Sequence, residues 1–249
     1  MTLSANRWLV RKPGARRRLR LYCFCYAGGS AANYANWQAD LDPSIEIVAI
    51  ELPARGTRFG EEPETSLSSL TVTVANVIAS AGHSSFAFFG HSLGALLAFE
   101  VARFLQQIGA VQPQHIFVSG GSAPQHRRDT GKMHLLSDDD FIDELKNYNG
   151  TPPAVLEHRE LMDLLLPMIR ADFALVANYT YRPAPLLAMP MTVLMGRDDD
   201  NGEGEHVTGW KKETSADCKI IWFEGDHFYI HPQRDAVLEC IRSEWLAQV

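Results

Sequence analysis

The sequence predicts an α/β fold, a mostly parallel, doubly wound sheet with helices on both faces. Short β-rich runs alternate with helical patterns along most of the chain, which is the order of elements in such sheets. The expected strands are mostly apolar throughout, as parallel strands covered on both faces are. The 249 residues are 46% hydrophobic and 21% charged, so we expect residues 1–249 to form one domain with a large core.

Each element follows from the hydrophobic pattern in chain order. Strands are expected at Leu21–Tyr26, Ile45–Leu52, Ser85–Gly90, His115–Gly120, Met191–Met195 and Ile220–Phe223. Helices between and after them are expected at Asn33–Leu41, Leu67–Ala81, Leu93–Ile108 and Ala236–Ala247. Strand, helix and parallel strand in succession form the repeating unit of a doubly wound sheet.

One connection is far longer than the others. After Gly120-Gly121, about seventy residues pass before the strand at Met191, which exceeds an ordinary crossover and predicts an insertion at approximately 123–188. Ser137 and Asp140 resemble a capping box that opens a helix through about Asn147, and Glu160–Tyr179 has a helical pattern. Apolar residues spread widely around this second helix. It is therefore expected either to be buried in a core or to line an apolar cavity as part of a lid.

Charge and hydropathy limit the partners. The formal net charge of -7 disfavours nucleic acid. Seven basic residues between Arg7 and Arg20 precede any acidic residue; they could touch an acidic partner, but a solvated edge hairpin around Lys12–Gly14 is the simpler interpretation.

Arg11-Lys12 follow Leu9-Val10 at once, so no secretory apolar region develops and the cytoplasm is expected. Polar residues interrupt the uncharged stretch Thr65–Phe99, so no membrane span is predicted.

The cysteines predict neither a metal site nor a disulfide. Cys23, Cys25, Cys218 and Cys240 include no C-x-x-C spacing and no histidine at zinc-finger distance. Cys23 and Cys25 lie two residues apart in an expected strand, so they share a face. We expect them to be packed core thiols rather than a redox couple.

The strongest local signal is Gly90-His91-Ser92-Leu93-Gly94, directly between an expected strand and an expected helix. Such a tight turn holds the serine in a strained conformation, and the two glycines let neighbouring chain pass closely. The hydroxyl is then exposed at the carboxyl edge of the sheet. The pattern predicts Ser92 as a nucleophile, whereas His91, adjacent in sequence, is expected to support packing.

A serine nucleophile needs an imidazole to accept its proton and a carboxylate to orient that imidazole. In this strand–turn–helix context the order along the chain is serine, acid, histidine. His227 follows the last expected strand and a Gly225-Asp226 turn, so it is the predicted base, and His231 is expected at the surface. The strand at Met191 is followed by three successive aspartates, Asp198, Asp199 and Asp200. Their order alone does not show which one orients the imidazole.

Two backbone amides are expected to stabilise the oxyanion. One is the N–H of Leu93, the residue after the nucleophile. The second should come from the first strand–helix loop, where Ala27 is preferred over Gly28. A phosphate-binding loop is the competing interpretation of this glycine pair, but the sequence contains neither G-x-G-x-x-G nor a Walker lysine there.

These residues carry a family likeness that covers most of the chain. The sequence resembles the type II thioesterases that accompany nonribosomal peptide and polyketide synthases, which have an α/β-hydrolase fold. Besides the serine turn, the similar segments are Tyr26–Gly29, Glu51–Gly56, Ser119-Gly120, Ala123-Pro124, Gly150–Pro152, Leu166–Phe173 and Gly225–Phe228. The family's G-x-x-D pattern implies that Asp199 is the triad acid, with Asp198 as the alternative, and the likeness implies a helical lid.

The resemblance implies hydrolysis of acyl thioesters held on the phosphopantetheine arm of an acyl or peptidyl carrier protein, without a metal or bound cofactor. A monomer is expected. Met168 and Phe173 are hypothesised to bound the acyl chamber, and Arg127, Arg128 and Lys132 to meet acidic carrier residues. The same triad also fits a carboxylesterase or lipase and an acyltransferase, and the fold also occurs in non-catalytic ligand-binding proteins.

Overall fold

The computed structural model describes residues 7–11, 18–82, 85–127, 132–148, 153–200 and 202–246. Its centre is a seven-stranded sheet with the order β1-β3-β2-β4-β5-β6-β7, parallel except for the β1–β3 pair. The strands are β1 Leu9–Arg11, β2 Leu19–Phe24, β3 Ile45–Ile50, β4 Phe86–His91, β5 Ile116–Ser119, β6 Met191–Gly196 and β7 Cys218–Phe223. All six predicted strands are confirmed, with ends displaced by one or two residues.

The sheet edge at β1 differs from the prediction. β1 was not expected, and it pairs antiparallel with β3 rather than with β2, so β3 separates the two strands that a hairpin would join. The edge position is confirmed, whereas the hairpin around Lys12–Gly14 lies outside the described residues. The buried carboxylate of Glu46 on β3 accepts from both Arg11 and Arg20, which favours β3 as the central strand of the three.

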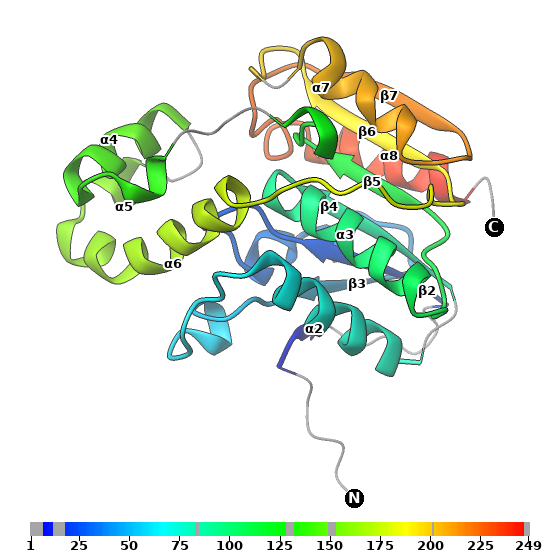
Figure 1. The fold of residues 1–249 in the computed structure, drawn as a ribbon, viewed down its shortest axis with the longest axis horizontal. Coiled ribbons are helices and arrows are strands. Elements are labelled where there is room, and N and C mark those ends of the chain that lie inside the picture. Colours follow the sequence, from blue (N-terminus) through cyan, green and yellow to red (C-terminus); the bar gives the residue numbers. More distant parts are fainter. Residues whose placement is uncertain are drawn as a thin grey trace, which may run out of the picture.

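Helices cover both faces of the sheet, as predicted (Figure 1). On one face α2 (Leu67–Ser80) and α3 (Leu93–Gln107) pack against strand residues such as Tyr22 and Phe88. On the other, α1 (Trp37–Asp40) and α8 (Arg234–Leu246) pack against Cys23 and Phe89. Successive strand residues therefore enter opposite cores, which explains why the strands are apolar on both sides.

The predicted helix at Asn33–Leu41 is confirmed only over Trp37–Asp40. The structure has a 3₁₀ turn at Ala31–Tyr34 and then only the single turn of α1. The Asn33 side chain explains the difference, because its oxygen accepts from the Ser30 N–H at 2.7 Å and its amide donates to the Tyr26 hydroxyl at 2.7 Å. Such local side-chain bonds favour a turn over a continuing helix.

The connection from β5 to β6 contains α4 (Asp138–Tyr148), α5 (Pro153–Leu156) and α6 (Arg159–Ala177). Both predicted helices are confirmed, and the Ser137 hydroxyl caps α4 by accepting from the Asp140 N–H at 3.3 Å. These helices share a small apolar core, which also includes Ala54 from the loop after β3. In Figure 1, α4 and α5 stand away from the sheet, and α6 runs back towards it. The similar segment Gly150–Pro152 lies outside the described residues.

Two further predictions concern the burial of α6 and of the cysteines. Most apolar residues of α6 are buried, but Leu164 is 61% exposed, so the helix is not enclosed all round. Cys23 and Cys25 are buried in one core cluster as predicted, and all four cysteines are free thiols. The short helix α7 (Gly204–Thr208) and the 3₁₀ turn Gly209–Lys212 were not predicted, because segments of five residues or fewer carry little periodicity.

Candidate active site

The turn between β4 and α3 has the strained geometry that the motif predicts. Ser92 adopts φ 57° and ψ −112°, in the left-handed half of the backbone map that side chains other than glycine rarely occupy. A Cβ at Gly90 would overlap the Gly94 carbonyl, and one at Gly94 would overlap the Phe24 carbonyl of β2. The Ser92 N–H donates to the Ser119 carbonyl at 2.8 Å. Glycine and hydrogen bonding therefore hold this turn directly against β2 and β5.

The structure brings Asp199, and not Asp198, to His227. The Asp199 carboxylate accepts from His227 Nδ1 at 2.7 Å, and the Asp199 residue is only 5% exposed. Asp198 and Asp200 are exposed. Because a carboxylate only accepts, this contact puts the ring proton on Nδ1 and leaves Nε2 as a proton acceptor. The backbone ties the two loops together, since the Asp198 N–H donates to the Gly225 carbonyl at 3.0 Å.

Ser92 and His227 both lie near Gly120-Gly121, the pair that follows β5. A Cβ at Gly120 would lie 3.3 Å from His227 Cε1, and one at Gly121 would lie 3.6 Å from the Ser92 carbonyl oxygen. Within the described residues the Ser92 hydroxyl makes no hydrogen bond to His227. Such bonds often form only when a substrate closes the site.

His91 is buried, and its ring lies beside the ring of His227. Its Nδ1 lies 2.9 Å from the Ser119 hydroxyl, which in turn lies 2.6 Å from the Tyr229 hydroxyl. The rings of His91 and His227 have centroids 5.0 Å apart. Burial lowers the pKa of His91 well below 6.5, and the nearby imidazoles of His227 and His231 lower it further. His91 is therefore a neutral packing neighbour of His227.

His231 is exposed, as predicted, and its Nε2 lies 3.3 Å from the Tyr26 hydroxyl. The ring of Phe228 stacks on it, with centroids 6.1 Å apart. His231 thus packs on the outer side of the loop that begins at Tyr26.

The two candidate amides in the first loop have different partners. The Gly28 N–H donates to Asp172 Oδ2 at 2.8 Å. The N–H groups of Ala27 and Leu93 have no acceptor within the part of the chain that the structure describes. Backbone donors without a partner near a nucleophile are what an oxyanion requires. The geometry therefore favours Ala27 over Gly28 as the second donor.

Arg55 and Asp172 contact the loop that carries Ala27, and the sequence did not single them out. Both lie in the similar segments quoted above, but nothing in their pattern indicated that they meet. In the structure they form a bidentate ion pair with two bonds of 2.7 Å, and Arg55 Nη1 also donates to the Gly29 carbonyl at 3.0 Å. No local pattern could have indicated the pair, because the two residues are 117 positions apart in the sequence.

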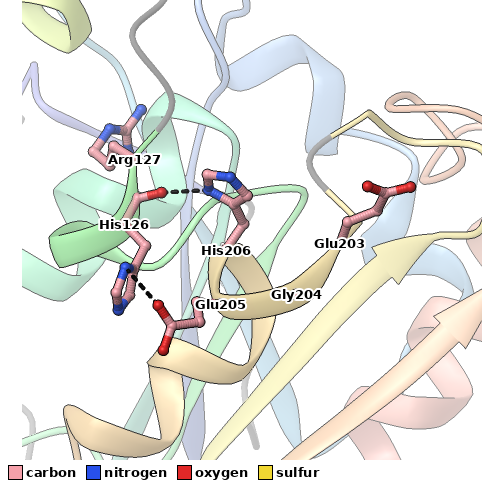
Figure 2. Close-up of a pocket in the computed structure, with 6 residues that line it drawn as sticks. All are labelled: His126, Arg127, Glu203, Gly204, Glu205 and His206. Carbon is pink, nitrogen blue, oxygen red and sulfur yellow. Dashed lines mark hydrogen bonds and ion pairs between the residues drawn. The ribbon is translucent and has the colours of Figure 1, made fainter.

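A separate pocket of about 570 Å³ lies where the chain leaves β5 and β6. Figure 2 shows its lining side chains, with His126 Nδ1 3.5 Å from Glu205 and His206 Nδ1 bonded to the His126 carbonyl. None of the predicted catalytic or oxyanion residues lines it, so it is distinct from the candidate active site.

In the described chain, no three His, Cys, Asp or Glu side chains are grouped to hold a metal ion, and no helix is long and apolar enough to cross a membrane.

The thioesterase domain family matches this chain over residues 19–244, a range that includes every predicted site residue. The chain belongs to that family. The resemblance to type II thioesterases is thereby confirmed, and the protein is a thioester hydrolase with the α/β-hydrolase fold.

Three similar proteins span almost the whole chain. Gramicidin S biosynthesis protein GrsT of Aneurinibacillus migulanus is 37% identical over 95% of this chain and 93% of its own. Linear gramicidin dehydrogenase LgrE of Brevibacillus parabrevis is 37% identical over 97% of this chain and 93% of its own. The solved structure of the type II thioesterase BorB from the borrelidin biosynthetic cluster has a TM-score of 0.89 and 34% identity, and it covers 97% of this chain and 99% of that one.

Proposed function

We propose that the protein is an editing thioesterase that removes acyl groups from the phosphopantetheine arm of carrier proteins in nonribosomal peptide or polyketide biosynthesis. The observation that carries this proposal is the buried Asp199–His227 pair, which lies at the same sheet edge as the strained Ser92 turn. The biosynthetic assignments of GrsT and BorB support the substrate class.

The proposed reaction uses side chains and main-chain amides alone. His227 Nε2 takes the Ser92 proton as the serine oxygen attacks the thioester carbonyl, and Asp199 stabilises the imidazolium. The Leu93 and Ala27 amides hold the oxyanion. The pantetheine thiol then leaves, protonated by His227, and water activated by the same histidine releases the acid from the acyl-enzyme. This scheme needs neither a metal nor a bound cofactor.

We propose that the β5–β6 connection, approximately 123–188, acts as a lid that admits the slim pantetheine arm and leaves the carrier outside. Met168 and Phe173 of α6 are proposed to bound the acyl chamber. Phe173 packs edge to face on Phe141 of α4, with ring centroids 5.5 Å apart, so a side chain of the proposed chamber is also part of the core of the connection.

The carrier surface, oligomeric state and location are further proposals. Arg127 and Lys132 lie at the beginning of the β5–β6 connection, where they could meet an acidic carrier; Arg128 lies outside the described residues. We propose that the protein acts as a cytoplasmic monomer, and light scattering of the purified chain would test the monomer directly.

The name of LgrE raises an oxidoreductase as a second candidate. A dinucleotide-dependent enzyme would need a glycine-rich phosphate loop after its first strand, but the sequence Tyr26-Ala27-Gly28-Gly29-Ser30 does not contain G-x-G-x-x-G. In addition, the Gly28 N–H is already bonded to the Asp172 carboxylate, whose charge would repel a phosphate. The hydrolase is therefore the better-supported function.

One experiment separates the candidates. Wild type and Ser92→Ala are incubated with acyl-loaded carrier protein, with free acyl pantetheine and with a simple oxygen ester, and acid release is followed. Release from the carrier, lost about 10³-fold or more in the variant, is expected. A preference for the oxygen ester would indicate an esterase. Transfer to an added alcohol or amine would indicate an acyltransferase, and consumption of reduced nicotinamide would indicate an oxidoreductase.

A further inference from the structure

The loop Tyr26–Ser30 presents the Ala27 amide, and its shape depends on Gly28. Gly28 has φ +77°, and the Gly29 N–H closes a turn onto the Tyr26 carbonyl at 2.9 Å. The Tyr26 carbonyl and the Ala27 N–H belong to one planar peptide group, so the bond that closes this turn also limits the direction of the Ala27 N–H. The Gly28 N–H lies inside the same turn, so a group that binds it helps to hold the turn that orients the Ala27 N–H.

Asp172 and Arg55 bind this loop on both sides of Gly28. Asp172 accepts the Gly28 N–H, while Arg55 donates to the Gly29 carbonyl and, through Nε, to the Pro53 carbonyl at 3.2 Å. The two side chains also hold each other by two parallel bonds, and Arg55 and Asp172 are only 5% and 1% exposed. This planar bidentate arrangement gives the carboxylate one orientation.

Asp172 belongs to α6, in the β5–β6 connection, 144 residues after Gly28. The same helix also makes an apolar contact with the loop, since Ala27 packs against the apolar cluster that includes Ile169 of α6. The helix of the proposed lid and the loop of the proposed oxyanion hole are therefore joined by a polar and an apolar contact.

Stability alone gives no reason for an ion pair at this position. A buried ion pair can often be replaced by apolar side chains of similar volume without loss of stability, because desolvation of the charges offsets their attraction. What apolar side chains cannot do is accept the Gly28 N–H and donate to the Gly29 carbonyl.

We propose that Asp172, oriented by Arg55, is a positioning residue that aims the Ala27 amide at the oxyanion, so that the hole is complete only while α6 lies against the loop. This inference rests on the proposed function. It adds that hydrolytic competence is coupled to the position of α6, through Asp172.

The test separates positioning from folding with the double variant Arg55→Met, Asp172→Leu. Both members of the ion pair are replaced together, so neither of these two charges loses only its partner. The variant is expected to fold with a lowered melting temperature, because the Gly28 N–H and the Gly29 and Pro53 carbonyls lose their bonds. The value of kcat for acyl-carrier hydrolysis is expected to fall about 10²-fold, as when an oxyanion donor is lost, with KM changed less than about threefold.

A trifluoromethyl ketone analogue of acyl pantetheine reports on the hole itself. Ser92 Oγ adds to its carbonyl carbon, the carbonyl π pair moves to oxygen as an oxyanion, and the serine proton passes to His227. The inhibition constant for this ketone is expected to rise in parallel with the fall in kcat. Binding of intact acyl carrier, measured in a Ser92→Ala background, should not change, because that complex has no oxyanion.

Arg55→Lys is a second variant, which retains the charge and therefore the fold. A lysine cannot bond both carboxylate oxygens and the Gly29 carbonyl in one plane, so a loss of about 10-fold in kcat is expected. Glu46→Gln is the matched control. Glu46 is also a buried carboxylate between arginines, Arg11 and Arg20, but it lies on β3 and has no contact with the loop Tyr26–Ser30.

A folded double variant with wild-type kcat would overturn the proposal, as would a fall in kcat without a matching loss of ketone affinity. If the double variant does not fold, wild-type kcat and ketone affinity in Arg55→Lys would overturn it instead. Failure of the proposed function would be distinct from either result, because wild type itself would then release no acid from the carrier.

Discussion

The nucleophile turn Gly90–Gly94 and the loop Tyr26–Ser30 lie at the same edge of the sheet but are held in different ways. The turn is positioned by its own backbone, because two glycines that permit close packing flank a serine with φ 57°. The loop is held by the side chains of Arg55 and Asp172, which come from distant segments. The proposed nucleophile is thus positioned locally, and the proposed oxyanion donor depends on long-range contacts.

This difference predicts whether a substitution in each part reduces stability or catalysis. A substitution in the turn meets backbone atoms that cannot move, so it should reduce stability. A substitution among the distant partners leaves the chain path intact and should reduce catalysis. The Asp199–His227 contact belongs to the second kind, since the two residues approach only through the loops after β6 and β7.

The largest expected effect is on catalysis, in Asp199→Asn. An amide at this position allows the wrong imidazole tautomer, so kcat should fall by a factor of about 10⁴ while the protein stays folded. Asp198→Asn is the matched control, one residue away and exposed, and should retain wild-type kcat. Steady-state hydrolysis of an acyl pantetheine measures both. Equal losses in the two variants would contradict the assignment of Asp199.

A smaller effect is expected on stability, in Gly94→Ala. Alanine is the better helix former in α3 by about 1 kcal/mol, but its Cβ would overlap the Phe24 carbonyl of β2. We expect the free energy of unfolding in urea to fall by about 3 kcal/mol. Gly60→Ala, where no atom lies within 4 Å of the added Cβ, is the control. A stable Gly94→Ala protein would show that the turn is not held by backbone contact.

The smallest effect concerns the pH dependence of stability. The pKa of His91 lies below its ordinary 6.5, so the unfolded chain binds a proton there that the folded protein does not. This contribution to stability is present above pH 6.5 and is lost as the pH falls towards the lowered pKa. The free energy of unfolding of His91→Asn, relative to wild type, should therefore rise by about 1 kcal/mol between pH 7.5 and 5.5.

Urea unfolding at the two pH values measures this difference. Gln107→Asn, an exposed substitution that removes no titratable group, is the control and should keep the wild-type pH dependence. Parallel pH profiles for His91→Asn and wild type would contradict a neutral, buried His91.

The order of strands and helices could be predicted because apolar runs and helical spacing are local properties of the sequence. The prediction failed where local polar bonding or shortness removed that signal, as at Asn33, whose side chain favours a turn, and at β1, which is three residues long. The residue type and spacing around Ser92 likewise indicated a nucleophile, because a strand–turn–helix with two glycines leaves few other conformations.

The partners of these residues were decided only by the tertiary structure. Three successive aspartates follow β6, and which of them meets His227 depends on how two loops pack. Ala27 and Gly28 are neighbours with equivalent amides, and the carboxylate of Asp172, 144 residues away, takes one of them. Sequence patterns report on hydrophobicity and backbone freedom over a few residues, whereas a hydrogen bond between distant segments exists only after the chain has folded. The sequence therefore determined the sheet and the strained turn of the proposed nucleophile, and the fold determined which acid and which amide lie near them.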